Sequence, residues 1–299
     1  MINLVPVAQA VNDTLAGLPG VNDERLLSLW LERFDSPNTR RAYARDAGMF
    51  LAFVAKPIGE ITYPDVAEWA GTLDGSESSR RRRLCSIRSL FSFAMRIGYV
   101  RFNVTAPIKL PKAPSKLASR ILDEADVIRM LVLEDHPRNR ALLHVLYYGA
   151  LRLDEALSLT WDSVIDRNDG RGQLNVIGKG RKARSILLPP RAFGMLRVLE
   201  GAAEPETPVF VARRSGRSSL SETQARRVVR AAAQRAGLKQ PVSPHWLRHA
   251  HASHAHQRGC PLAVIGETLG HASLSTTSTY VHARPDSSSA LWLDGAGGG

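Results

Sequence analysis

The sequence predicts a mainly α-helical protein of two domains, an all-helical domain followed by a mixed α/β domain with a small β-sheet. The length of 299 residues suits about two domains, and 44% hydrophobic with 23% charged residues is an ordinary composition for a folded chain. Helical periodicity dominates the first hundred residues. Alternating or β-branched segments occur only in the second half, between helical ones. A mostly disordered chain is therefore excluded.

Four helices are expected in the first domain. Apolar residues at helical spacing predict the first, from Leu26 to Phe34. Ser36 followed by Pro37 predicts the start of the second, because serine caps helices and proline suits their first position. Residues 63–69 form a third, short helix, and residues 76–98 form an amphipathic fourth.

The second domain begins with a helix after Leu122 and a second one that ends near Gly149. Three strands are then predicted, around residues 161–165, 174–177 and 185–188, and the glycine-bounded turn GKGRK joins the last two. The later helices are SETQARRVVRAAAQRAG, which opens with the capping box of Ser221 and Gln224, HWLRHAHASHAHQRG, and PLAVIGETLG.

These elements divide the chain at a proline-rich stretch with little apolar periodicity, NVTAPIKLPKAPSKLAS. The expected division is an arm over residues 1–20, a helical domain over 21–104, a linker over 105–120, a mixed domain over 121–285 and a tail over 286–299. No run of 18 apolar residues predicts a membrane helix, and the first residues lack the basic flank of a secretory signal. Two cysteines, Cys85 and Cys260, are too few for a disulfide framework and suggest a reducing compartment.

The charge is strongly positive. Forty Lys and Arg oppose 28 Asp and Glu, which gives +12 and a pI near 10.3, and 33 of the 40 are arginine. Arginine binds phosphate in a bidentate fork, so this bias points to a nucleic acid, although a GC-rich genome also inflates arginine. Residues 1–110 carry +3 (14 basic, 11 acidic) and residues 111–299 carry +9 (26 basic, 17 acidic). We therefore expect the anion to sit mainly on the second domain.

Two basic segments are candidates for contact with a nucleic-acid backbone. Four consecutive arginines open the fourth helix, and lysines punctuate the linker. A solvated helix face is the alternative for the arginine run. The candidate residues are Arg80, Arg81, Arg82, Arg83, Lys112 and Lys116.

His245, Arg248 and His249 share one helix face through spacings of three and four. Such a set of potentially cationic groups suits a bound anion, and a solvated face is the alternative. Five histidines between His245 and His256 also raise the possibility of zinc. Neither cysteine lies near them and their helix holds no carboxylate, so no metal and no cofactor is expected.

Two further cationic residues occupy unusual positions. Arg152 stands between Leu151 and Leu153, so we expect it to be partly buried with Glu155 as its brace. This pair is either a plain structural ion pair or an arginine oriented toward phosphate. Lys179 stands between two glycines at a hairpin tip, where it could donate a proton to a docked ligand or remain a solvated turn residue.

His271 follows a helix-terminating glycine, and Tyr280 comes nine residues later among small hydroxyl residues. Alone, each would be taken for packing or surface. The order Arg152, Lys179, His245 with Arg248, His271 and Tyr280, however, resembles the catalytic set of the tyrosine recombinase (phage integrase) family. The resemblance covers residues 22–285, and the length is similar to that of the compact Xer-type members.

This resemblance implies a core-binding helical domain, a catalytic domain with the tyrosine recombinase fold, and double-stranded DNA as substrate. Tyr280 would attack a phosphodiester and form a covalent 3′-phosphotyrosine; Arg152 and Arg248 would hold the phosphate, Lys179 would protonate the leaving oxygen, and His245 and His271 would assist, with Glu155 and His249 in supporting positions. The family further implies a homotetramer on two DNA sites, with a paralogous recombinase as an alternative partner, acting in the cytoplasm at the nucleoid for mobile-element integration and excision or for resolution of DNA multimers.

Two alternatives remain at this level. A type IB topoisomerase-like DNA relaxer has the same residue set, but the helical first domain and the short length favour recombination. A non-catalytic DNA-binding regulator on the same fold would be expected to have lost Tyr280 or an arginine, and neither is missing.

Overall fold

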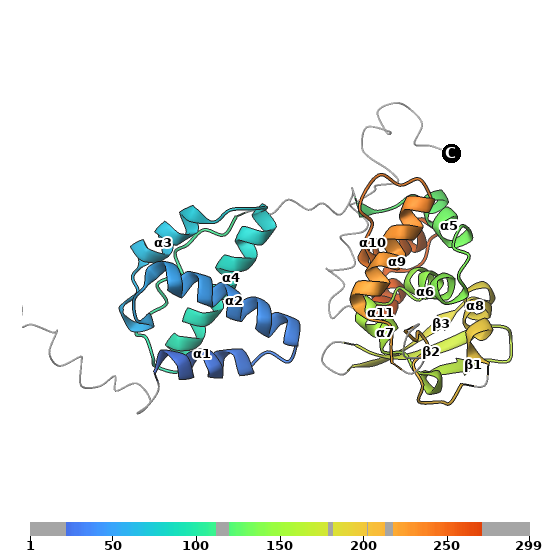
Figure 1. The fold of residues 1–299 in the computed structure, drawn as a ribbon, viewed down its shortest axis with the longest axis horizontal. Helices are drawn as coiled ribbons and strands as arrows, with labels where there is room; N and C mark the ends of the chain where they lie inside the picture. Colours follow the sequence, from blue (N-terminus) through green and yellow to red (C-terminus); the bar gives the residue numbers. More distant parts are fainter. Residues whose placement is uncertain (1–21, 112–119, 179–181, 202, 213–217, 271–299) are drawn as a thin grey trace, which may run out of the picture. The chain divides into compact units, whose positions relative to one another are not determined.

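A computed structural model describes residues 22–111, 120–178, 182–201, 203–212 and 218–270. The chain divides into two compact units, with the boundary between Pro114 and Ser115. Each unit is described by itself (Figure 1). Among the described residues, no helix combines the length and the apolar character needed to cross a membrane.

The first unit is all-helical, as the sequence predicts. Its α-helices are α1 (Asp23–Glu32), α2 (Pro37–Val54), α3 (Tyr63–Thr72) and α4 (Glu77–Arg96), with a 3-10 turn at Ile58–Glu60. Ser36 caps α2 by accepting a hydrogen bond from the Thr39 backbone, and Ser76 caps α4 in the same way. Aromatic side chains contribute to a mainly aliphatic core, in which Phe50 of α2 packs edge-on against Trp69 of α3 and Phe91 of α4.

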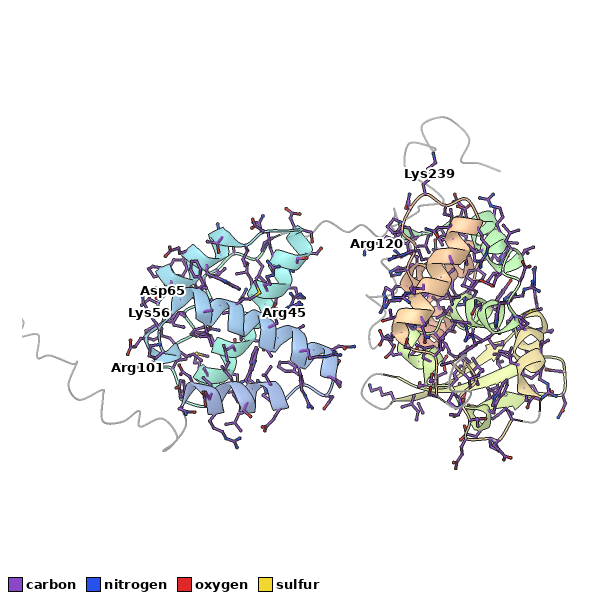
Figure 2. All side chains as sticks on the ribbon, in the orientation of Figure 1. Arg45, Lys56, Asp65, Arg101, Arg120 and Lys239 are labelled. Atoms are coloured by element: carbon purple, nitrogen blue, oxygen red, sulfur yellow. The ribbon has the colours of Figure 1, made fainter. Side chains whose placement is uncertain are left out.

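Polar contacts tie the helices of this unit together. Asp46 of α2 is fully buried and accepts hydrogen bonds from both terminal nitrogens of Arg82 of α4. Lys56 and Asp65, close together in Figure 2, form a 2.6 Å ion pair at the start of α3. The hydrogen bond from Lys56, followed by those from Thr62, lowers the pKa of Asp65 to about 2.

The second unit combines seven helices with a sheet in its described part. The helices are α5 (Glu124–Val132), α6 (Pro137–Tyr148), α7 (Leu153–Leu157), α8 (Pro190–Glu200), α9 (Glu222–Arg235), α10 (Pro244–Gln257) and α11 (Leu262–Leu269). α10 packs against α5, α6 and α11, so it forms the centre of the helical layer. The buried core runs from Val127 of α5 through Leu146 of α6 to Leu247 of α10.

The sheet is antiparallel with strand order β1-β2-β3, formed by β1 (Val164–Asp166), β2 (Gly172–Ile177) and β3 (Ala183–Leu188). One row pairs Val164 with Leu174 and Leu174 with Ile186. Leu174 and Ile186 are buried, and β3 packs against α8 and α11, whereas Leu187 on the other face is half exposed. The sheet thus lies beside these helices at one end of the unit (Figure 1).

Three details differ from the sequence-based expectation, the first being the short α7, for which no helix was predicted. The first strand begins at Val164, because Trp161–Ser163 form a 3-10 turn in which Trp161 is buried. α8 was not anticipated, although Pro190 at its first turn is a typical start signal. The mainly helical fold class with one small sheet is confirmed.

Candidate active site

The loop after α6 presents Arg152. Gly149 ends α6, and Ala150 adopts a left-handed conformation with φ of 49°, which turns the chain sharply before Arg152. Arg152 then precedes the first residue of α7, and its backbone N–H donates to Glu155 Oε2 at 2.8 Å. Its guanidinium also donates to Glu155 Oε1 at 2.8 Å. Both ends of Arg152 are therefore held by one carboxylate.

Glu155 is the centre of a larger cluster of charges. Arg184 of β3 donates to Oε1 at 3.0 Å and to Oε2 at 2.8 Å, and Arg248 of α10 approaches Oε2 at 3.9 Å. The Glu155 side chain is only 2% exposed, against 30% for Arg152. Three guanidinium groups thus surround one buried carboxylate, and Arg152 is the group of the three that reaches furthest into solvent.

These contacts keep Glu155 ionised. Burial alone would raise the pKa of the carboxyl group, but the hydrogen bonds from Arg184 and Arg152 and the charge of Arg184 lower it to about 2. Because two positive charges remain in excess of the carboxylate, the cluster is suited to an anion.

Arg248 is buried almost completely, at 2% exposure. Its guanidinium donates to the carbonyl oxygen of Ala150 at 2.5 Å and to that of Leu269, the last residue of α11. Arg248 therefore links α10 to the Arg152 loop and to the end of α11.

His245 and His249 occupy adjacent turns of α10, with ring centroids 4.6 Å apart. His245 keeps one side exposed, yet the protein packed around the rest of its ring lowers its pKa, and the charges of Arg248 and Arg152 act in the same direction. His245 is therefore neutral at physiological pH and can accept a proton.

The structure thus brings Arg152, Glu155, Arg248 and His245 together through contacts and mutual charge effects, with the His249 ring edge-on to that of His245. Lys179, His271 and Tyr280 lie outside the described residues, as do Lys112 and Lys116. Gly178 and Gly270, which precede Lys179 and His271 in the sequence, are described, and both border Arg184.

The arginine run of α4 does not form one basic face. Consecutive helical residues point about 100° apart, so four in a row surround the helix. Arg82 binds Asp46, Arg81 donates to the Pro111 carbonyl at 2.9 Å, and Arg83 donates to the Asp74 carbonyl at 3.0 Å. Contact of Arg80–Arg83 with DNA remains a prediction, and Arg82 has a structural role in addition.

The described residues hold no cluster of histidine, cysteine or acidic side chains suited to a metal. His254 of α10 instead forms hydrogen bonds of 2.9 Å with the Tyr147 hydroxyl and the Leu122 carbonyl. The neighbouring His251 has its pKa lowered to about 4, mainly by burial, so it is uncharged. These histidines hold α10 against its neighbours.

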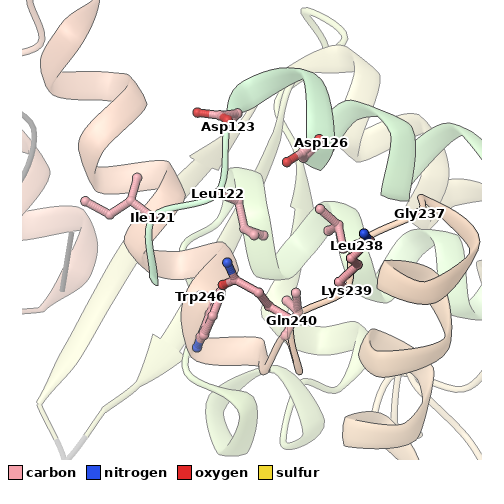
Figure 3. Close-up of a pocket in the computed structure, with 10 residues that line it drawn as sticks. Ile121, Leu122, Asp123, Asp126, Gly237, Leu238, Lys239, Gln240 and Trp246 are labelled. Carbon is pink, nitrogen blue, oxygen red and sulfur yellow. The ribbon is translucent and has the colours of Figure 1, made fainter. Parts of the chain in front are cut away.

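A cavity of about 410 Å³ borders Trp246, the residue after His245. It is lined by the segments around Leu122 and Leu238, and Asp123, Asp126 and Lys239 edge it (Figure 3). His245 and Arg248 are not among its lining residues. The cavity is therefore separate from the charge cluster.

Sequence reasoning overlooked Arg184. Arg184 lies two and four residues before Ile186 and Leu188 in β3, so the three side chains share one face of the strand. Ile186 and Leu188 are both buried, so the arginine lies on the inward face of a predicted strand. A charged residue in that pattern needs a buried partner, and this was the signal that could have identified it.

Comparisons with known proteins agree with this arrangement. Residues 118–286 match the model of the phage integrase family, and residues 24–98 match that of the phage integrase N-terminal SAM-like domain. The tyrosine recombinase XerC of Xylella fastidiosa (strain 9a5c) is 33% identical over 273 residues, which cover 87% of this chain and 91% of that protein.

Solved structures share the fold. The XerH site-specific recombinase bound to difH substrate in a pre-cleavage complex has a TM-score of 0.67 and 21% identity, covering 92% of this chain and 84% of that one. A lambda integrase tetramer bound to a Holliday junction has a TM-score of 0.66 and 16% identity, covering 91% and 82%.

The helical unit, the mixed catalytic-type unit and these matches define a class of two-domain recombinases. The chain belongs to the phage integrase family. It is a tyrosine-type site-specific recombinase.

Proposed function

We propose that this recombinase cuts and rejoins double-stranded DNA through a covalent bond between Tyr280 and a 3′ phosphate. The observation that carries the proposal is the cluster in which Arg152 and Arg248 converge on Glu155 beside a neutral His245. A phosphodiester in transfer gains negative charge on its non-bridging oxygens, and preorganised guanidinium groups are suited to stabilise it.

Arg152 is the group best placed to reach the phosphate, because it is the most exposed of the three arginines around Glu155. Arg248 adds positive charge from its buried position beside Glu155. Its hydrogen bond to the Ala150 carbonyl fixes the loop that carries Arg152. Glu155 orients both guanidinium groups, and its single negative charge leaves the cluster positive.

The proton transfers fall to the other residues. A phenol of pKa about 10 is about a thousandth ionised at neutral pH, so Tyr280 needs help to lose its proton. Neutral His245 can accept it, supported by His249. We assign Lys179 to protonation of the leaving 5′ oxygen and His271 to a hydrogen bond with the phosphate. Rejoining reverses these steps, with the bond energy kept in the phosphotyrosine.

The partners follow from the family and the charge. We assign residues 21–104 to DNA binding, 105–120 to a linker along the backbone and 121–285 to catalysis, between an arm (1–20) and a tail (286–299). The lambda integrase tetramer on a Holliday junction supports an assembly of four protomers on two DNA sites. A paralogous recombinase is the alternative partner in this assembly. We expect the enzyme to act in the cytoplasm, at the nucleoid, either in integration and excision of a mobile element or in resolution of DNA multimers.

Covalent capture tests the proposal. The protein is incubated with duplexes of randomised sequence, and DNA that stays attached after denaturation is recovered and sequenced. The wild-type chain is expected to yield one preferred sequence joined through its 3′ phosphate. Tyr280→Phe should lose the adduct and keep DNA binding in a gel shift, whereas Tyr63→Phe, an exposed tyrosine of the first unit, should retain both. An adduct that survives Tyr280→Phe contradicts the assignment.

A further inference from the structure

Arg184 of β3 forms three hydrogen bonds within the charge cluster. Its two terminal nitrogens donate to the two Glu155 oxygens, at 3.0 and 2.8 Å, and its Nε donates to the Thr268 carbonyl at 3.0 Å. The side chain is 10% exposed, so the three donors act away from bulk water. This arginine is therefore built into the protein and is not displayed to a ligand.

The partners of Arg184 belong to two different segments. Glu155 lies on α7 and orients Arg152 from both its backbone and its guanidinium. Thr268 lies in the last turn of α11. Arg184 itself stands in β3, next to the turn that bears Lys179 in the sequence. One side chain thus joins the hairpin, the Arg152 turn and the end of α11.

Two glycines make room for this arginine. A Cβ at Gly178 would lie 3.1 Å from Arg184 Nη1, and a Cβ at Gly270 would lie 3.1 Å from the same atom and 3.2 Å from Cζ. Gly270 also has φ of 61°, a conformation that other residues rarely adopt. The chain therefore passes close to the guanidinium at both glycines, and a side chain at either position would push against it.

We propose that Arg184 is a positioning residue, which holds Glu155 and the end of α11 together so that Arg152 keeps the orientation needed for strand cleavage. It acts through Glu155 and touches no reacting atom. The inference rests on the recombinase function proposed above. It adds a residue from β3 to a set that sequence reasoning drew from loops and helices alone.

The geometry requires arginine in particular. A planar guanidinium presents a parallel pair of N–H groups to a carboxylate and a third N–H from Nε in another direction. Lysine carries the same charge on a single nitrogen, so it cannot bind both Glu155 oxygens and Thr268 in this geometry. A lysine variant therefore preserves charge and loses the linkage.

The test measures single-turnover cleavage of the duplex selected by covalent capture, and DNA affinity by gel shift, for Arg184→Gln and Arg184→Lys. Arg171→Gln is the matched control, because Arg171 precedes β2 and pairs with Asp169 on the exposed surface. We expect both Arg184 variants to bind DNA as the wild type does and to cleave about 10- to 100-fold more slowly, the range typical for residues that orient a reactive group.

Each outcome has a separate meaning. If Arg184→Lys cleaves at the wild-type rate, the linkage is unnecessary and the proposal is overturned, even where Arg184→Gln fails to fold. If both variants lose DNA affinity in proportion to rate, Arg184 binds DNA and does not position Arg152, which also overturns it. If the wild type forms no covalent adduct at all, the proposed function fails. The role of Arg184 is then tested by NMR of the labelled Glu155 carboxyl group, whose pKa Arg184→Lys should raise. An unchanged pKa refutes the linkage.

Discussion

Replacement of Glu155 by glutamine should destabilise the second unit strongly, because each carboxylate oxygen accepts two N–H groups. Oε1 accepts from Arg152 and Arg184, and Oε2 accepts from the Arg152 backbone and again from Arg184. Glutamine must place its NH₂ group against two donors in either orientation, and it leaves the arginines without a counter-charge.

The magnitude follows from the carboxyl group. A pKa of about 2, against the ordinary 4.5, corresponds to about 3 kcal/mol of stabilisation at neutral pH. Measured losses for breaking a buried pair are also about 3–5 kcal/mol. Because the pKa is lower in the folded state, this stabilisation is complete above the unfolded value of 4.5 and is lost as the pH falls toward 2.

Hydrogen exchange of peptides from α7 and α10, measured in the full chain over a urea series at pH 7, reports this unit without interference from the other. Glu155→Gln should lower the free energy of unfolding by about 3 kcal/mol. Glu222→Gln, which affects an exposed pair with Arg226, should lower it by less than about 0.5 kcal/mol. In urea unfolding followed by circular dichroism, the difference between wild type and Glu155→Gln should shrink between pH 5 and pH 3. A loss below about 1 kcal/mol, or a difference independent of pH, would refute the reasoning.

Three further predictions concern other parts of the molecule. Asp46→Asn should destabilise the first unit by about 1–3 kcal/mol, less than a fully buried pair because Arg82 is 37% exposed, and exchange of α2 amides in urea would show it. Gly172→Ala should cost about 1–3 kcal/mol, because its Cβ would lie 2.6 Å from Phe193 Cγ; equal thermal melting of mutant and wild type would contradict this. The pKa of His245 is lowered, so the cleavage rate should stay level as the pH falls through 6.5 and decline only further down, when the ring gains a proton; a decline centred at or above 6.5 in a pH series would show that the ring is not held neutral.

The helices were predictable because local signals determine their ends. Ser36 with Pro37, and Ser221 with Gln224, cap helices where the sequence placed them. The strand near Trp161 was placed too early, because its alternation did not distinguish a buried 3-10 turn from a strand.

The candidate site was predictable only in part. The pairing of Arg152 with Glu155 follows from a spacing of three residues, and it is present. The contacts of Glu155 with Arg184 and Arg248 join residues 29 and 93 positions apart, and no local pattern encodes them. The arginine run of α4 shows a further limit of sequence reasoning, since a charge count does not reveal that Arg82 is held by a buried aspartate.

The burial of Arg248 affects what a genetic screen of this protein can distinguish. Its guanidinium donates hydrogen bonds to two backbone carbonyls from distant segments. Most replacements there will therefore lower the amount of folded protein as well as the activity. A screen for lost activity will recover position 248 readily and will not separate scaffold from function. At position 152, where the guanidinium is more exposed, the proposed phosphate contact predicts that a substitution abolishes activity and leaves the abundance of the protein in the cell nearly unchanged.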